Sequence, residues 1–129
     1  MITEDYVSFE TAKLLKEKGF DCTCEHQYIN CSSGYPFLTD IRDDTGCYYK
    51  NSEIGEDEYS APTLQMAMKW LRDTHGLFIH IDVIREASCW LADIQDIKGD
   101  VSIYPVKKEF PNYEEACEAA IRYCLENLI

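Results

Sequence analysis

The sequence predicts an α+β fold, in which an antiparallel sheet of about four to six strands has three helices packed on it. Three observations predict it. Some segments carry apolar residues at helical spacing between capping residues, others alternate apolar and polar residues, and turn signals separate neighbouring strands. The expected order is α-β-β-β-α-β-β-β-α. A chain of 129 residues has the usual size of one domain, so we expect residues 1–129 to form one compact domain.

Three segments have the apolar spacing of a helix that is buried on one side. Their ends coincide with residues that cap or stop helices, such as serine, asparagine, proline within the first turn and glycine beyond the last. The expected helices are Phe9 to Lys18 between Ser8 and Gly19, a second starting at Ser60-Ala61-Pro62 and closed by His75-Gly76, and Tyr113 to Leu128 capped by Asn112.

Six segments have the character of strands, and the clearest is Leu77 to Ile84. In the first of them the alternation predicts that Cys22 and Cys24 face inward. The remaining expected strands are Phe20 to His26, Phe37 to Ile41, Cys47 to Tyr49, Trp90 to Ile97 and Val101 to Val106, with a hairpin loop at Gly99-Asp100 and an exposed loop from Asn51 to Glu58.

The charge is strongly negative, with 24 acidic against 12 basic residues and a formal net charge of -12. Such a charge repels phosphates, so we expect neither direct nucleic-acid binding nor binding to an anionic membrane. The sharper interpretation is an acidic surface that imitates DNA and inhibits a basic nucleic-acid-binding protein. Its seven acids are Asp40, Asp43, Asp44, Glu53, Glu56, Asp57 and Glu58. The simpler interpretation is a solvated acidic loop.

Seven cysteines raise the question of the compartment. Their number is odd and the N-terminal residues lack the basic and apolar regions of a signal peptide, so we expect reduced thiols and a cytoplasmic location. The longest apolar stretch is too short to span a bilayer.

Cys22, Cys24, His26 and Cys31 are the one cluster of residues that zinc prefers as ligands. The single residue between the first two cysteines is a shorter gap than structural zinc sites use. Buried thiols in a core explain these residues without a metal. We therefore expect no metal and no cofactor.

Two weak catalytic candidates exist. Cys31 lies beside a Ser-Ser-Gly turn and is the more exposed candidate nucleophile. His80 and Asp82 share one face of a predicted strand, and Asp93 and Gln95 can face them from the neighbouring strand to line a pocket. The alternative is that this is the solvated face of the sheet.

Large rings concentrate in the predicted meander, at Tyr35, Phe37, Tyr48 and Tyr49. Exposed aromatic residues are typical of protein interfaces, so these four are the candidate partner-binding residues. Short motifs that identify common enzyme classes, such as a Walker A loop or HExxH, are absent from the sequence. We therefore expect a non-enzymatic accessory or protein-binding module with an unidentified protein partner. The alternatives are the DNA mimic and a small enzyme at His80 and Asp82.

Three blocks of the sequence are MITEDYVSFETAKLLKEKGF, YSAPTLQMAMKWLRDTHGLFIHIDV and YEEACEAAIRYCLENLI. Together they resemble a family of small acidic proteins from gut anaerobes and their phages and integrated elements, to which no function is assigned. The resemblance implies a bacterial or phage cytoplasm, and it implies no catalytic residue.

Overall fold

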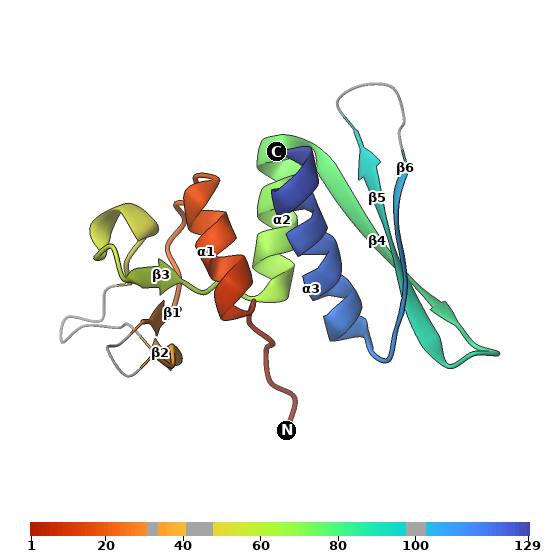
Figure 1. Ribbon diagram of the computed structural model, residues 1–129, viewed down its shortest axis with the longest axis horizontal. Helices are drawn as coiled ribbons and strands as arrows, with labels where there is room; N and C mark the ends of the chain where they lie inside the picture. The colour runs from red at the N-terminus through yellow and green to blue at the C-terminus, as the bar shows by residue number, and fades with distance from the viewer. Residues whose placement is uncertain (31–33, 41–47, 98–102) are drawn as a thin grey trace. The chain divides into compact units, whose positions relative to one another are not determined.

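The computed structural model describes residues 1–30, 34–40, 48–97 and 103–129 (Figure 1). It confirms the α+β class and the predicted order of elements. The strands form two antiparallel sheets of three strands each. Contacts group the chain into two compact units, residues 1–63 and residues 64–129, and each unit contains one sheet. The expected hairpin loop at Gly99-Asp100 lies outside the described residues.

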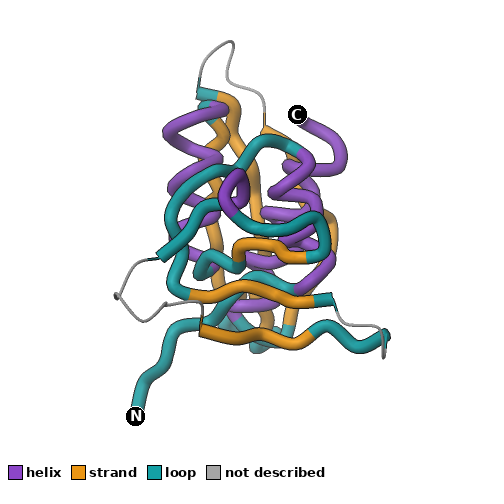
Figure 2. Tube along the Cα trace, turned by 90° about the vertical axis from the view of Figure 1, so that its left-hand side faces the viewer, coloured by secondary structure: helices purple, strands orange, loops and turns teal. Residues whose placement is uncertain are grey.

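The N-terminal unit contains one α-helix and a small sheet with the strand order β2-β1-β3. Figure 2 looks toward this unit and shows its short strands side by side. β1 is central and pairs antiparallel with both neighbours. The elements are α1 (Phe9–Glu17), β1 (His26–Ile29), β2 (Phe37–Asp40), the 3-10 helix η1 (Asn51–Glu53) and β3 (Glu58–Ser60).

Local sequence signals determine where α1 begins and ends. The Ser8 hydroxyl accepts a hydrogen bond from the Thr11 amide at 3.2 Å, as an N-cap should. Gly19 follows the helix with a φ of +92°, a left-handed conformation that favours glycine. Within the unit, the Phe9 ring contacts the rings of Tyr28 and Tyr59, with centroids 5.7 and 5.5 Å apart. The helix therefore packs on the sheet face that carries these two tyrosines.

Two strand expectations for this unit are wrong, and the expected loop is confirmed only in part. The strand expected at Phe20 to His26 instead starts at His26, and Cys24 forms only an isolated bridge with Tyr49. Of the strand expected at Cys47 to Tyr49, Cys47 lies outside the described residues and Tyr49 forms only this bridge, and the third strand of the unit is β3. The loop expected from Asn51 to Glu58 is largely exposed, but it contains η1 and the start of β3, and Asn51 itself is 6% exposed. Its side-chain amide donates to the Phe20 carbonyl at 2.8 Å. This carbonyl therefore bonds a side chain, whereas the predicted strand would have bonded it to the backbone of a neighbouring strand.

The C-terminal unit is a meander of three long strands with two helices. Its elements are α2 (Leu64–His75), β4 (Leu77–Ile84), β5 (Cys89–Asp96), β6 (Ile103–Phe110), α3 (Tyr113–Tyr123) and a π-helical turn (Cys124–Leu128). β4 has the predicted bounds, and Asn112 caps α3 by accepting from the Glu115 amide at 2.8 Å. The predicted start of the second helix is wrong: Ser60 ends β3, and the helix begins at Leu64.

α2 and α3 cover one face of this sheet (Figure 1). The β4–β5 register places Ile79 opposite Ile94, and both are buried on the helix side. On α3 the small residues Ala116, Cys117 and Ala120 are fully buried, which lets the helix lie close to the strands. Because side chains alternate along a strand, the opposite face carries a different set of residues, which on β4 is Phe78, His80, Asp82 and Ile84.

Asn51 gives the first prediction. Its amide nitrogen donates to the Phe20 carbonyl, and its side-chain oxygen accepts from the Ser60 amide at 2.9 Å. Asn51→Ala leaves both buried backbone groups without these partners, so we expect the free energy of unfolding to fall by about 2–4 kcal/mol. Urea unfolding followed by circular dichroism measures it. Asn30→Ala is the control, because Asn30 is exposed and bonds Asp57 through its backbone. Equal stability of both variants would contradict the assigned role.

Candidate functional site

The strand β2 exposes large apolar side chains at the edge of the N-terminal sheet. Tyr35, just before it, is 82% exposed, and within it Phe37 is 49% and Leu38 39% exposed. Among the described residues β2 pairs only with β1, so its outer edge has no strand beside it. Of the four predicted aromatic residues, the structure thus places Tyr35 and Phe37 on an exposed edge.

The other two aromatic residues lie elsewhere. Tyr48 and Tyr49 are both half-buried, and the Tyr49 carbonyl accepts a hydrogen bond from the Cys24 amide at 3.3 Å. Leu38 belongs to the exposed set, and sequence reasoning missed it. The adjacent pair Phe37-Leu38 could have indicated this exposure. Consecutive strand residues project from opposite faces of a sheet, so a core on one face buries only one of them.

The register shows which residues share a face with Phe37. Phe37 pairs with Ile29, which pairs with Glu58, and the next row is Thr39, Gln27 and Ser60. Paired residues in antiparallel strands project on the same side. These rows alternate with the row of Tyr28 and Tyr59, which faces α1. Phe37, Gln27 and Glu58 therefore lie on the sheet face opposite α1.

A hollow of about 370 Å³ lies at this part of the unit, and we call it the acidic hollow. It is lined by Gln27, Asp40, Tyr49, Glu53, Ile54, Gly55 and Glu58. Two of its carboxylates are oriented by backbone amides: Glu53 accepts from the Lys50 amide at 2.9 Å, and Glu58 accepts from the Gly55 amide at 3.3 Å. Two negatively charged groups at the acidic hollow are therefore held in fixed orientations.

Gln27 lines the acidic hollow and carries a buried acceptor. This residue is 9% exposed, and its side-chain oxygen Oε1 is buried without a donor among the described residues. Buried polar atoms normally have hydrogen-bond partners, so an orphaned acceptor at a hollow is unusual. Sequence reasoning missed Gln27, because nothing in the order Glu-His-Gln-Tyr shows that this amide would be enclosed.

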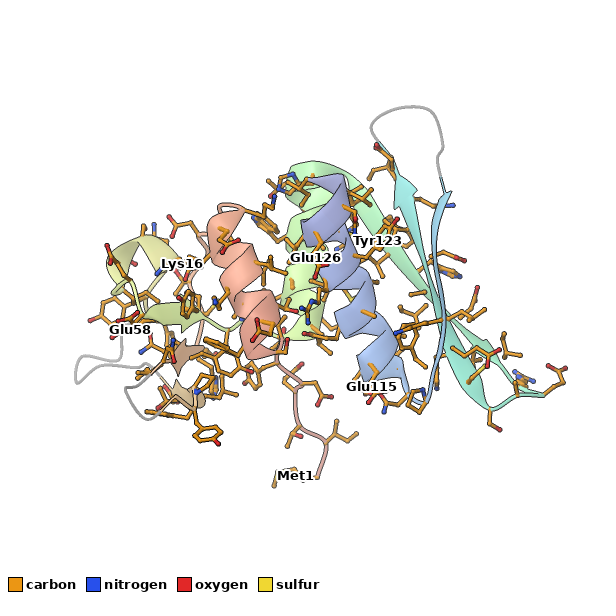
Figure 3. All side chains as sticks on the ribbon, viewed as in Figure 1. Met1, Lys16, Glu58, Glu115, Tyr123 and Glu126 are labelled. Atoms are coloured by element: carbon orange, nitrogen blue, oxygen red, sulfur yellow. The ribbon has the colours of Figure 1, made fainter. Side chains whose placement is uncertain are left out.

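Lys16 holds the loop that forms one side of the acidic hollow (Figure 3). Its ammonium Nζ donates to the carbonyls of Gly55 and Glu58, at 2.8 Å in each case, and lies 5.1 Å from the centre of the Tyr59 ring. The Lys16 charge is thus directed at backbone carbonyls and a ring face.

The C-terminal unit has a second hollow, of about 300 Å³, on the sheet face away from α2 and α3. Phe78, His80, Asp93 and Gln95 line it. The register pairs Phe78 with Gln95 and His80 with Asp93, so the predicted polar set does come together. His80 Nε2 lies 3.0 Å from Asp82 Oδ1. An imidazole held by a carboxylate can accept or donate a proton, so this group is the second candidate site.

Of the predicted zinc ligands, the three that the structure describes, Cys22, Cys24 and His26, do not form a metal-binding group. Cys24 is buried and donates weakly to the Cys22 carbonyl at 3.5 Å, Cys22 is half-exposed, and Cys31 lies outside the described residues. His26 packs its ring 4.4 Å from that of Tyr6. Within the described part of the chain, no three His, Cys, Asp or Glu side chains are grouped as metal ligands.

The buried cysteines are poor nucleophiles. Burial raises the pKa of the Cys24 thiol to about 12, with a smaller contribution from Cys22. Burial also raises the pKa of Cys117 to about 11 and that of Cys124 to about 12. A thiol reacts as its thiolate, so these three thiols are protonated and inert at neutral pH.

No helix among the described residues is long and apolar enough to cross a membrane. Comparison with known proteins finds no matching family, no matching curated sequence and no matching solved structure. The resemblance of the three sequence blocks to proteins of gut anaerobes and their phages stays a prediction.

The thiols give the second prediction. With iodoacetamide at pH 8, we expect Cys22 to be alkylated in the folded protein, because it is half-exposed. Cys24, Cys117 and Cys124 should react only after urea is added, because burial blocks the reagent and raises their pKa values. Peptide mass spectrometry measures each site, and Cys22 serves as the internal control. Alkylation of Cys24 as fast as Cys22 in the folded protein would contradict the prediction.

Proposed function

We propose that this chain is a non-enzymatic protein-binding module of a bacterial or phage cytoplasm, and that it binds its protein partner through β2. The observation that supports the proposal is the exposure of Tyr35, Phe37 and Leu38 at the outer strand of the N-terminal sheet. The residues differ in part from those expected from sequence, because Leu38 replaces the half-buried Tyr48 and Tyr49.

Edge strands in proteins are normally protected against pairing with other chains. Charged side chains, prolines or bulges usually provide this protection. β2 has the sequence Phe-Leu-Thr-Asp, in which one charge stands at the very end. Among the described strands β2 pairs only with β1, so its outer edge, next to exposed apolar side chains, suits the addition of a strand from a partner, where the backbone gives affinity and the side chains give specificity.

The net charge of -12 leaves the DNA-mimic function as the competing interpretation. The two differ in the force that holds the partner. Attraction between an acidic surface and a basic groove weakens steeply as salt is added, whereas burial of apolar side chains does not. Affinity at rising salt concentration therefore separates them, and we expect a much weaker dependence than an interface held by charge alone would show.

The third prediction tests this proposal. Phe37→Ser/Leu38→Ser removes the apolar side chains of an exposed strand, so the protein should stay folded but lose its partner. Capture from cells that naturally produce the protein measures binding, and a photo-reactive benzophenone amino acid at position 35 should cross-link to the same captured protein.

The matched control is Val83→Ser/Ile97→Ser, which removes two exposed apolar side chains, 47% and 57% exposed, from the other unit. This variant should capture the partner as the unmodified protein does. Capture that survives in Phe37→Ser/Leu38→Ser, or an absence of cross-links from position 35, would refute binding through β2. Capture lost only at high salt would favour the DNA mimic.

A second candidate function is a small-molecule site at the hollow of Phe78, His80, Asp93 and Gln95, which combines a ring, a proton-transfer group and an amide. The fourth prediction is that a bound compound raises the melting temperature by several degrees, since a ligand that binds only the folded state stabilises it. Thermal-shift screening of small polar compounds measures it, and His80→Gln should abolish the rise. A screen without any stabilising compound would remove this candidate.

A further inference from the structure

We propose that the partner segment is extended and carries an arginine whose guanidinium group enters the acidic hollow. This inference rests on the proposed function, because it names the chemistry of the segment that pairs with β2. Its support comes from the Gln27 acceptor, from the surrounding carboxylates and from the register, which places Gln27 and Glu58 on the face of Phe37.

The Gln27 acceptor requires a donor. Oε1 is buried, and no N–H or O–H group of the described residues reaches it. A buried carbonyl oxygen without a partner is destabilising, and a bound donor removes this cost. The occupant of the acidic hollow should therefore present N–H groups at its inner end.

The carboxylates require that this donor be a cation. Glu53 and Glu58 line the same hollow, and each is held in place by a backbone amide that leaves further lone pairs on the carboxylate. Lys16, the lysine bound to this loop, directs its ammonium at the carbonyls of Gly55 and Glu58. A cation from outside is thus attracted to the two carboxylates.

Guanidinium fits this set of acceptors better than ammonium does. It has five N–H donors in a planar fork, so one group can bond an amide oxygen and carboxylates at once, and charge-assisted bonds of this kind are strong. A volume of about 370 Å³ also accommodates a side-chain head group with its water. These requirements select arginine over lysine.

The register shows how an arginine of an added strand reaches the acidic hollow. A strand added at the outer edge of β2 lies two strand spacings, about 10 Å, from β1 and Gln27. Only a long side chain spans that distance across the sheet. Because Phe37 and Gln27 share the face opposite α1, the same partner face contacts the Phe37 ring and inserts the arginine.

The first experiment uses N-methylguanidinium chloride as the probe and the full ¹⁵N-labelled chain. We expect saturable NMR shifts of the Gln27 side-chain amide and the Gly55 backbone amide. Tetramethylammonium chloride at equal concentration has the charge without the donors and should not cause them. Shifts that do not saturate, or that are equal with tetramethylammonium, would overturn the proposal, as would saturation by magnesium chloride instead.

Matched variants test the carboxylates. Glu53→Gln/Glu58→Gln keeps an oxygen that accepts each backbone amide but removes two charges from the acidic hollow. Glu56→Gln/Asp57→Asn removes two charges from exposed side chains of the same loop that do not line it. We expect the first variant to weaken guanidinium binding and partner capture by about tenfold or more, and the second to change neither.

The outcomes separate this proposal from the proposed function. If Phe37→Ser/Leu38→Ser loses the partner while Glu53→Gln/Glu58→Gln retains full capture, binding through β2 stands and the arginine is refuted. If N-methylguanidinium causes saturable shifts but the carboxylate substitutions do not change partner capture, the ligand of the acidic hollow is a small free cation and the proposal fails. If guanidinium binds while Phe37→Ser/Leu38→Ser still captures the partner, the proposed function fails and the strand-borne arginine fails with it.

Discussion

The side chain of Asn51 is the constraint on which the N-terminal unit depends. It donates to the carbonyl of Phe20, which follows α1, and accepts from the amide of Ser60, which ends β3. One buried amide thus replaces the ladder bonds that two separate backbone segments would otherwise need. Next to it, Asp21 accepts from the Ser52 amide at 2.8 Å and strengthens the same junction. The loop that carries Glu53 and Glu58 starts at this point, so Asn51 fixes one end of a segment that lines the acidic hollow, although Asn51 does not line the hollow itself.

The two sheets use their faces differently. In the C-terminal unit, α2 and α3 cover one face and leave the other to Phe78, His80, Asp93 and Gln95. In the N-terminal unit, α1 covers the face of Tyr28 and Tyr59, and Gln27 and Glu58 on the opposite face line a hollow, where the buried Gln27 oxygen has no donor among the described residues. In the first arrangement the polar groups of the open face are partly exposed to solvent. The second has unsatisfied hydrogen-bonding capacity beside exposed apolar side chains, and this combination favours recognition of another molecule.

The parts of the fold that the sequence predicts are those with local causes. Ser8 and Asn112 cap helices through residues three positions away, and the alternation in Leu77–Ile84 reflects one buried face. β1 and β3 could not be predicted, because Asn51 diverts the backbone of Phe20 by a bond across 31 positions. The polar set at His80 was predictable because it follows strand periodicity. The acidic hollow was not, since the enclosure of Gln27 depends on residues from three separate segments.

The strand order β2-β1-β3 has a consequence for the way the chain folds. In the C-terminal unit each strand pairs with its neighbour in sequence, so its sheet can grow by closing short loops. In the N-terminal unit Ile29 pairs with Glu58, and this contact closes a much longer loop. Contacts between distant residues are costly in entropy and form late. Before β3 pairs with β1, both β1 and β2 have an edge without a neighbouring strand. Unpaired strand edges promote aggregation, so we expect the incompletely folded N-terminal unit to be the more aggregation-prone part of the chain.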